Sequence, residues 1–158
     1  MEEWINILFK AFWCGCAALG FGILFNVPRK NLAEVWMGGA IVGLIKFSVL
    51  IYISPSIILA SFLAALILGI YSMVIALVRH EPQMIVAIPS VIPLVPGVFA
   101  YRTMFGLIKL TGNVGPDFAR TLSETVHNGI LTLFIIMAFT IGVIIPYEFG
   151  KEISKQIN

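Results

Sequence analysis

The sequence predicts an all-α, polytopic membrane protein of about five transmembrane helices, the fourth of them broken by prolines. The 158-residue chain is 59% hydrophobic and 11% charged, whereas soluble domains are about 45–50% apolar and about 25% charged. Its apolar stretches reach the length of about 20 residues that a span needs. The fourth stretch carries three prolines within eight residues. We therefore expect a single transmembrane domain over residues 1–158.

Charge and motif content exclude several classes of function. The net charge of +2 comes without a basic patch with interleaved aromatic residues, which argues against nucleic-acid binding. The sequence has no nucleophile elbow, paired histidines, CxxC or phosphate loop, so we expect no enzyme activity, cofactor or metal site. Cys14 and Cys16 lie too close along the chain for an ordinary disulfide and are interpreted as small packing residues.

The first two spans are predicted at residues 4–25 and 32–53. The second contains Gly39 and Gly43 at GxxxG spacing, which is typical of a helix-packing face. It also contains Lys46 about two-thirds of the way along. A charge at that depth is costly and usually faces protein or water, so Lys46 is a candidate for a pathway or coupling role, with snorkelling as the alternative.

The third span is predicted at residues 57–78, after a short Ser-Pro-Ser turn that favours an antiparallel pair with the second span. Small residues recur in it at four-residue steps and indicate a second packing face: Ser61, Ala65 and Gly69.

The fourth span, residues 84–110, contains Pro89, Pro93 and Pro96, followed by Gly97. Each proline lacks an N–H and clashes with the carbonyl four residues earlier. We therefore expect helical continuity to be lost around residues 89–97, although prolines in membrane helices often only kink them. Interrupted backbone is tolerated in a membrane where it is buried in protein or lines a wet cavity, and it often marks a transporter binding site.

Free carbonyls at such an interruption accept from an ammonium group, and the amides that start the next helix donate to a carboxylate. The predicted substrate-binding residues are therefore Pro89, Pro93, Pro96, Gly97, Tyr101 and Arg102. Arg102 is suited to pair with a substrate carboxylate, with a salt bridge to Glu124 or snorkelling as alternatives. Tyr101 suits either a cover over the site or an interfacial position.

The last span is predicted at residues 118–145, ending before Pro146. Its first turns are polar, and one face is suited either to line a pathway or to project into water; it carries Arg120, Glu124, His127 and Asn128. With five crossings, one side of the membrane gathers five of the ten basic residues, against Lys109 and Arg120 beside the opposite loop, which predicts an external N-terminus and a cytoplasmic C-terminus; the five are Arg29, Lys30, Arg79, Lys151 and Lys155.

Four sequence pieces occur in order: FNVP before a basic loop, GGAIVG in the second span, IPSVIPLVPGVFAYRTM in the fourth and TIGVIIP in the last. In these the chain resembles the small membrane subunit of the threonine/serine exporter family, over nearly its whole length. The most specific piece is VIPLVPG with a tyrosine four residues after the glycine. Carried over by position, this motif comprises Ile92, Pro93, Pro96, Gly97 and Tyr101.

The resemblance implies a plasma-membrane transport subunit that exports threonine, serine or a small carboxylate such as succinate. It implies a larger partner subunit that supplies another five-span half, and we interpret the small-residue stripes on spans two and three as exposed faces compatible with such a partner. The alternative is a scaffold that transports nothing itself and stabilises the larger subunit.

Overall fold

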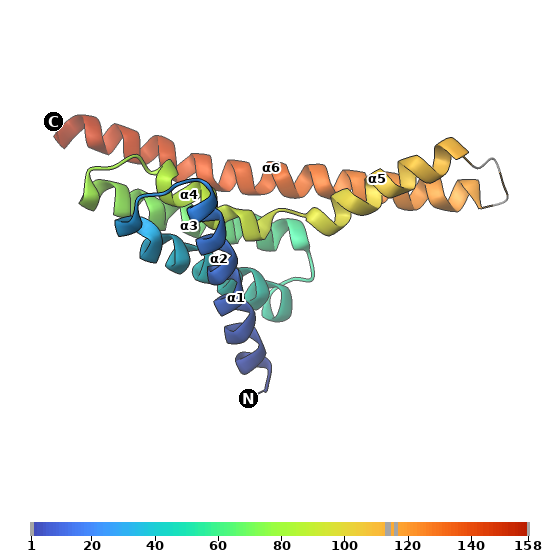
Figure 1. Cartoon of the computed structure of the whole chain (residues 1–158), viewed down its shortest axis with the longest axis horizontal. Helices are drawn as coiled ribbons and strands as arrows, with labels where there is room; N and C mark the ends of the chain where they lie inside the picture. The colour runs from blue at the N-terminus through green and yellow to red at the C-terminus, as the bar shows by residue number, and fades with distance from the viewer. Residues whose placement is uncertain (1, 113–114, 116, 158) are drawn as a thin grey trace. The chain divides into compact units, whose positions relative to one another are not determined.

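The computed structural model describes residues 2–112, 115 and 117–157, with side chains up to residue 152 (Figure 1). This part of the chain is helical and contains no strand, which confirms the all-α class. Two short 3-10 turns, η1 (Arg29–Asn31) and η2 (Ile92–Leu94), accompany the α-helices, which are α1 (Glu2–Leu24), α2 (Leu32–Tyr52), α3 (Ile57–Arg79), α4 (Met84–Val91), α5 (Gly97–Gly112) and α6 (Phe118–Ile157).

Length and hydropathy make the described chain a multi-pass membrane protein. Four of its helices are long and apolar enough to cross a bilayer: α1, α2 with η1, α3, and α6 as far as Glu152. α4 and α5 satisfy the same criterion only as a pair, interrupted by a short break. The candidate spans thus number four, or five when the interrupted pair counts as one, as the sequence predicts.

The chain forms two compact units. Unit 1 comprises Met1–Leu94 and Ala138–Asn158, and unit 2 comprises Val95–Met137. The expectation of one transmembrane domain stays a prediction.

In unit 1, α1, α2 and α3 pack as successive antiparallel neighbours. The predicted GxxxG face of α2 packs closely on α1, where a Cβ added at Gly39 would lie 2.4 Å from the Cβ of Ala18. One added at Gly43 would lie 2.8 Å from the Cβ of Cys14, so that cysteine is a packing residue. Two buried clusters form the core, one around Val42 and Leu68 and the other around Ala18 and Val35.

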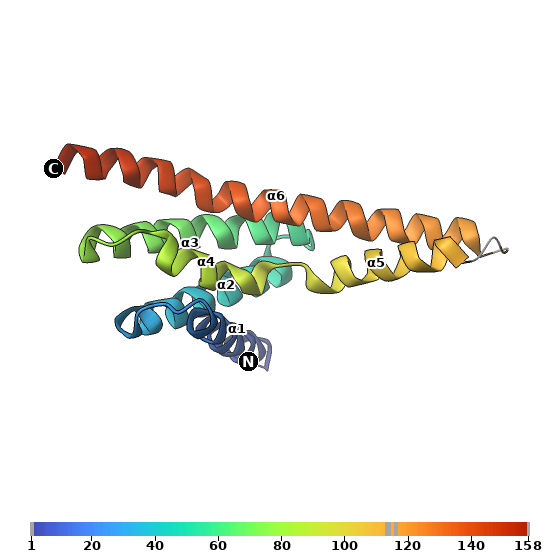
Figure 2. The same ribbon diagram turned by 45° about the horizontal axis from the view of Figure 1, so that its top comes forward.

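The C-terminal half of α6 packs on α3 through small residues (Figures 1 and 2). The contacting pairs are Ala65 with Gly142, Gly69 with Pro146, and Met73 with Gly150. Residue numbers increase in the same direction along both helices, so the two helices run parallel. Ser61 and Ala65 are fully buried. The stripes on the second and third spans are therefore occupied inside unit 1, and their interpretation as exposed partner faces is wrong.

Helix ends follow local chemistry. α1 ends before Asn26 and α3 before His80, with φ of 58° and 53°, in the left-handed conformation that closes many helices. Asn and His tolerate this conformation better than bulkier residues. The Ser56 side chain caps the start of α3 by accepting from the amide of Leu59 at 3.5 Å.

α6 continues through Pro146 to Ile157, beyond the predicted end of the last span at residue 145. Gly69 makes this possible, because an added Cβ there would lie 2.8 Å from the ring of Pro146 and 3.2 Å from the carbonyl oxygen of Gly142. That carbonyl is the one whose helical donor Pro146 removes. Gly69 on the neighbouring helix thus leaves room both for the proline ring and for the carbonyl that has lost its donor.

Candidate functional site

The interruption of the fourth span is shorter than the sequence predicts. α4 remains α-helical through Pro89, and the 3-10 turn η2 carries the chain through Pro93. Only Val95 and Pro96 leave helical geometry. A 3-10 turn bonds residues three apart, so it can continue where a proline has removed the donor four residues on. The expected loss of continuity around residues 89–97 is thus confined to two residues.

The start of α5 is set by Pro96. Its carbonyl accepts the amide of Ala100 at 3.0 Å, and the amide of Gly97 donates to Val95 at 2.9 Å. As at any helix start, the next two amides, those of Val98 and Phe99, have no helical acceptor. They form the positive end of the helix dipole, to which a carboxylate is a suitable ligand.

The predicted binding residues around this start differ in their surroundings. Gly97 is exposed, and a Cβ added there would meet no atom within 4 Å. Its φ is negative, so neither space nor backbone conformation requires glycine within the described chain. Tyr101 is 68% exposed and stacks on Phe105 at a ring separation of 6.0 Å. Arg102 is exposed and has no ion pair among the described residues.

Upstream of the interruption, Pro89 and Pro93 belong to unit 1. Pro89 is fully buried, and Pro93 is half-buried. The neighbouring Ser90 is also fully buried and donates to the carbonyl of Val35 at 3.0 Å. A Cβ added at Gly38 would lie 2.5 Å from the Ser90 hydroxyl, so α4 rests closely on α2. The sequence interpretation did not include Ser90.

The predicted pathway residues do not form one group. Lys46 is half-buried on α2 in unit 1 and has no ion pair among the described residues. On α6, Arg120 pairs with Glu124 at 3.0 Å, and the Asn128 amide donates to the Glu124 carbonyl at 2.7 Å. Both members of the ion pair are largely exposed, and His127 is exposed as well. Glu124 thus takes Arg120 as partner, whereas the proposed salt bridge to Arg102 does not form.

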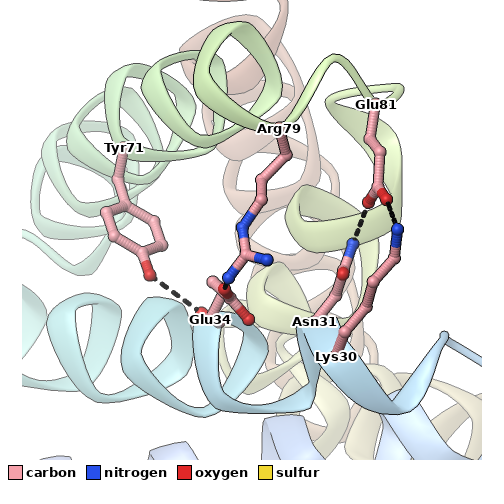
Figure 3. A network of polar contacts seen from close by, with 6 residues as sticks. All are labelled: Lys30, Asn31, Glu34, Tyr71, Arg79 and Glu81. Carbon is pink, nitrogen blue, oxygen red and sulfur yellow. Dashed lines mark hydrogen bonds and ion pairs between the residues drawn. The ribbon is translucent and has the colours of Figure 1, made fainter.

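A cluster of polar residues that the sequence interpretation missed joins the loops at the basic end of unit 1 (Figure 3). Glu34, in the first turn of α2, pairs with Arg79 at the end of α3. Glu81, after α3, pairs with Lys30 and accepts from the Asn31 amide. The hydrogen bond and charge of Lys30, together with the hydrogen bond from Asn31, lower the pKa of Glu81. We call Lys30, Asn31, Glu34, Arg79 and Glu81 the loop cluster.

The loop cluster extends further onto α3, where the Tyr71 hydroxyl donates to the Glu34 carbonyl at 3.2 Å. Glu34 carries a signal that sequence reasoning could have used. It is an acid only three positions into an apolar helix of 21 residues, and ionisable groups at such positions are rare unless they are paired or functional.

In unit 2, an open cavity of about 530 Å³ lies where α5 ends and α6 begins. Lys109, Asp117 and Thr121 contribute polar groups to its lining. It contains none of the predicted binding residues, so the site proposed from the prolines and this cavity are separate features of the chain.

Comparison with known proteins gives the family. The family model described as "Threonine/Serine exporter, ThrE" matches residues 10–148. An uncharacterized protein of Haemophilus influenzae is 28% identical over 146 residues, which cover 90% of this chain and 47% of that protein. The chain thus spans about half the length of this relative. No solved structure matches the chain. The chain is a member of the threonine/serine exporter family, a family of membrane transport proteins.

Proposed function

We propose that the chain is the transmembrane transport part of an exporter for threonine, serine or a small carboxylate such as succinate. The observation that carries the proposal is the interruption at Val95 and Pro96. A 16-residue helix begins directly after it, in the middle of an apolar segment. The family supports the transport role in general. The choice among these substrates rests on the chemistry of the interruption.

The amides at the start of α5 supply donors for a substrate carboxylate, which threonine, serine and succinate all carry. Arg102 lies little more than one turn into α5 and has no ion pair among the described residues, so its guanidinium is free to pair with the same group.

A larger partner subunit is part of the proposal. The Haemophilus relative is about twice as long as the segment it shares with this chain, so its remaining half has no counterpart here. A second chain that supplies this half would complete the transporter. We place the assembly in the plasma membrane, as the resemblance implies. We place the N-terminus outside, because five of the ten basic residues gather at the other end of unit 1.

The test uses two glycines that have equal space around them. A Cβ added at Gly97 or at Gly20 meets no atom within 4 Å, so we expect the fold to accept leucine at either position. We expect Gly97→Leu to lower export of labelled substrate from loaded vesicles at least about tenfold, because the side chain covers the amides at the start of α5. Gly20→Leu should export like the wild type, and both variants should reach the membrane in equal amounts.

The scaffold alternative makes the opposite prediction. Under it, Gly97→Leu and Pro96→Leu both export at the wild-type rate when the larger subunit is present, and so does Arg102→Ala. Gly39→Leu then lowers the amount of the larger subunit, because it disturbs the packing of α1 on α2. Wild-type export by the Gly97 and Pro96 variants would defeat the transport proposal for this chain.

A further inference from the structure

Glu34 is the only charged residue that is buried in the part of the chain the structure describes. The whole residue is 9% exposed, and every other acid or base with a described side chain is half-buried or exposed. A buried carboxylate needs a positive partner or hydrogen-bond donors, because isolation from water is costly for a charge. The polar contacts of Glu34 therefore show whether its carboxylate has all the partners that it needs.

Those contacts are incomplete. Oε1 of Glu34 accepts from the Arg79 guanidinium, whereas Oε2 is buried and has no hydrogen-bond partner among the described residues. Asn31, three residues earlier and 1% exposed, repeats the pattern. Its amide nitrogen donates to Glu81, and its Oδ1 is buried without a donor in the described chain. Two buried oxygen acceptors at one end of α2 thus lack a donor or a cation.

The ion pair between Glu34 and Arg79 is asymmetric in exposure. The Arg79 side chain is 43% exposed and the Glu34 side chain 11%. Arg79 can therefore turn into water at modest cost, but Glu34 would remain behind as an unpaired buried charge. Any state of the protein in which Arg79 leaves requires another positive charge at Glu34.

We propose that Glu34 and Asn31 form a binding site for sodium, which replaces Arg79 as partner of the Glu34 carboxylate. Sodium takes oxygen ligands, which Oε2 of Glu34 and Oδ1 of Asn31 would supply. The single negative charge of the Glu34 carboxylate matches a monovalent ion. The coupling role of this site rests on the proposed transport function, but binding itself does not.

The charged and titratable groups around Glu34 come from three elements (Figure 3). α3 contributes Arg79 and the Tyr71 hydroxyl, η1 contributes Lys30, and the loop after α3 contributes Glu81. Lys30 and Glu81 neutralise each other as a pair. Arg79 is then the group that competes with an entering cation, so its removal should strengthen binding.

The experiment measures thermal unfolding of the purified chain in detergent, without any transport. Sodium chloride replaces choline chloride at pH 8 and constant ionic strength. We expect this exchange to raise the melting temperature of the wild type by at least about 2 °C, since a ligand that binds only the native state stabilises it. Glu34→Gln should lose this response.

Three further variants keep the result interpretable. Glu81→Gln removes the other acid of the loop cluster and should retain the response, whereas Arg79→Ala should enlarge it. Asn31→Ala should weaken the response to sodium. The proposal is overturned if sodium does not stabilise the wild type, or if Glu34→Gln responds as the wild type does. Gly97→Leu should keep the response, so failure of export and failure of cation binding are separate outcomes.

Discussion

Glu81 connects two loops of unit 1 through side chains alone. It pairs with Lys30 and accepts from Asn31, both from the segment between α1 and α2, while its own backbone follows α3. These partners favour the ionised carboxylate, and the pKa of Glu81 is accordingly lowered, chiefly by Lys30. A lowered pKa in the folded state makes folding stability depend on pH.

The sign of that dependence gives a prediction. The contribution of Glu81 is fully present above the pKa that its carboxyl has in the unfolded chain, and it is lost as pH falls through the lower pKa of the folded state. We expect the melting temperature of the wild type to fall in the acid range below the ordinary glutamate pKa, and that of Glu81→Gln to fall less. Parallel melting curves for the two proteins across this range would contradict the assignment.

His80 illustrates how a residue with two interpretations is decided by its backbone. A histidine in a loop is suited to carry protons, and it is also often just solvated. Here it closes α3 in the left-handed conformation with φ of 53°, and its amide donates to Ala76. This role at the end of α3 is the one that the structure gives to His80.

At the scale of helices, small residues decide which faces meet. Gly39 is the tightest position between α1 and α2, because a Cβ added there would lie 2.4 Å from the Cβ of Ala18 and 2.8 Å from the carbonyl oxygen of Cys14. A backbone carbonyl cannot move aside as the end of a flexible side chain can. Substitution at Gly39 must therefore separate the helices.

We expect Gly39→Leu to destabilise the purified chain by about 2 kcal/mol or more, as overpacking of a close contact does. Gly20→Leu is the matched control on α1, where an added side chain meets no atom within 4 Å, and it should change stability by less than about 0.5 kcal/mol. Thermal unfolding in detergent compares the two. Equal melting temperatures would show that α1 and α2 do not pack through this face.

The helices that the sequence predicts well are those whose ends depend on nearby residues. α1, α2 and α3 lie within two residues of their predicted bounds, because apolar length and turn residues determine them. The passage of α6 through Pro146 depends instead on Gly69, which is 77 positions earlier in the chain. No local pattern around a proline reveals such a distant compensation.

The candidate site also has features that nearby residues predict and features that depend on distant contacts. Three prolines predict an interruption, but its restriction to Val95 and Pro96 depends on η2 continuing through Pro93. The loop cluster was missed because Glu34 and Arg79 are 45 residues apart and meet only once α2 and α3 pack. A single acid in an apolar helix indicates that a partner exists without naming it.

At the scale of the whole chain, the parallel packing of α3 with the second half of α6 bears on how the chain crosses the membrane. Within unit 1, α3 ends at Arg79, and α6 passes Gly142 beside Ala65 and Gly150 beside Met73. Both helices therefore run toward the same end of the unit. We therefore expect the interrupted pair of α4 and α5 to be one broken crossing rather than a re-entrant loop, the two possibilities that its bend leaves open.

This arrangement predicts which loops share a side. We expect single cysteines at Pro28, Pro82 and Lys151 to react with a membrane-impermeant maleimide only after cells are opened, since basic residues gather near all three. A cysteine at Pro55, in the turn between α2 and α3, should react in intact cells. Cys14→Ala and Cys16→Ala provide the cysteine-free background. If Lys151→Cys instead behaves as Pro55→Cys does, the interrupted segment re-enters, and α6 cannot run parallel to α3 as it does in unit 1.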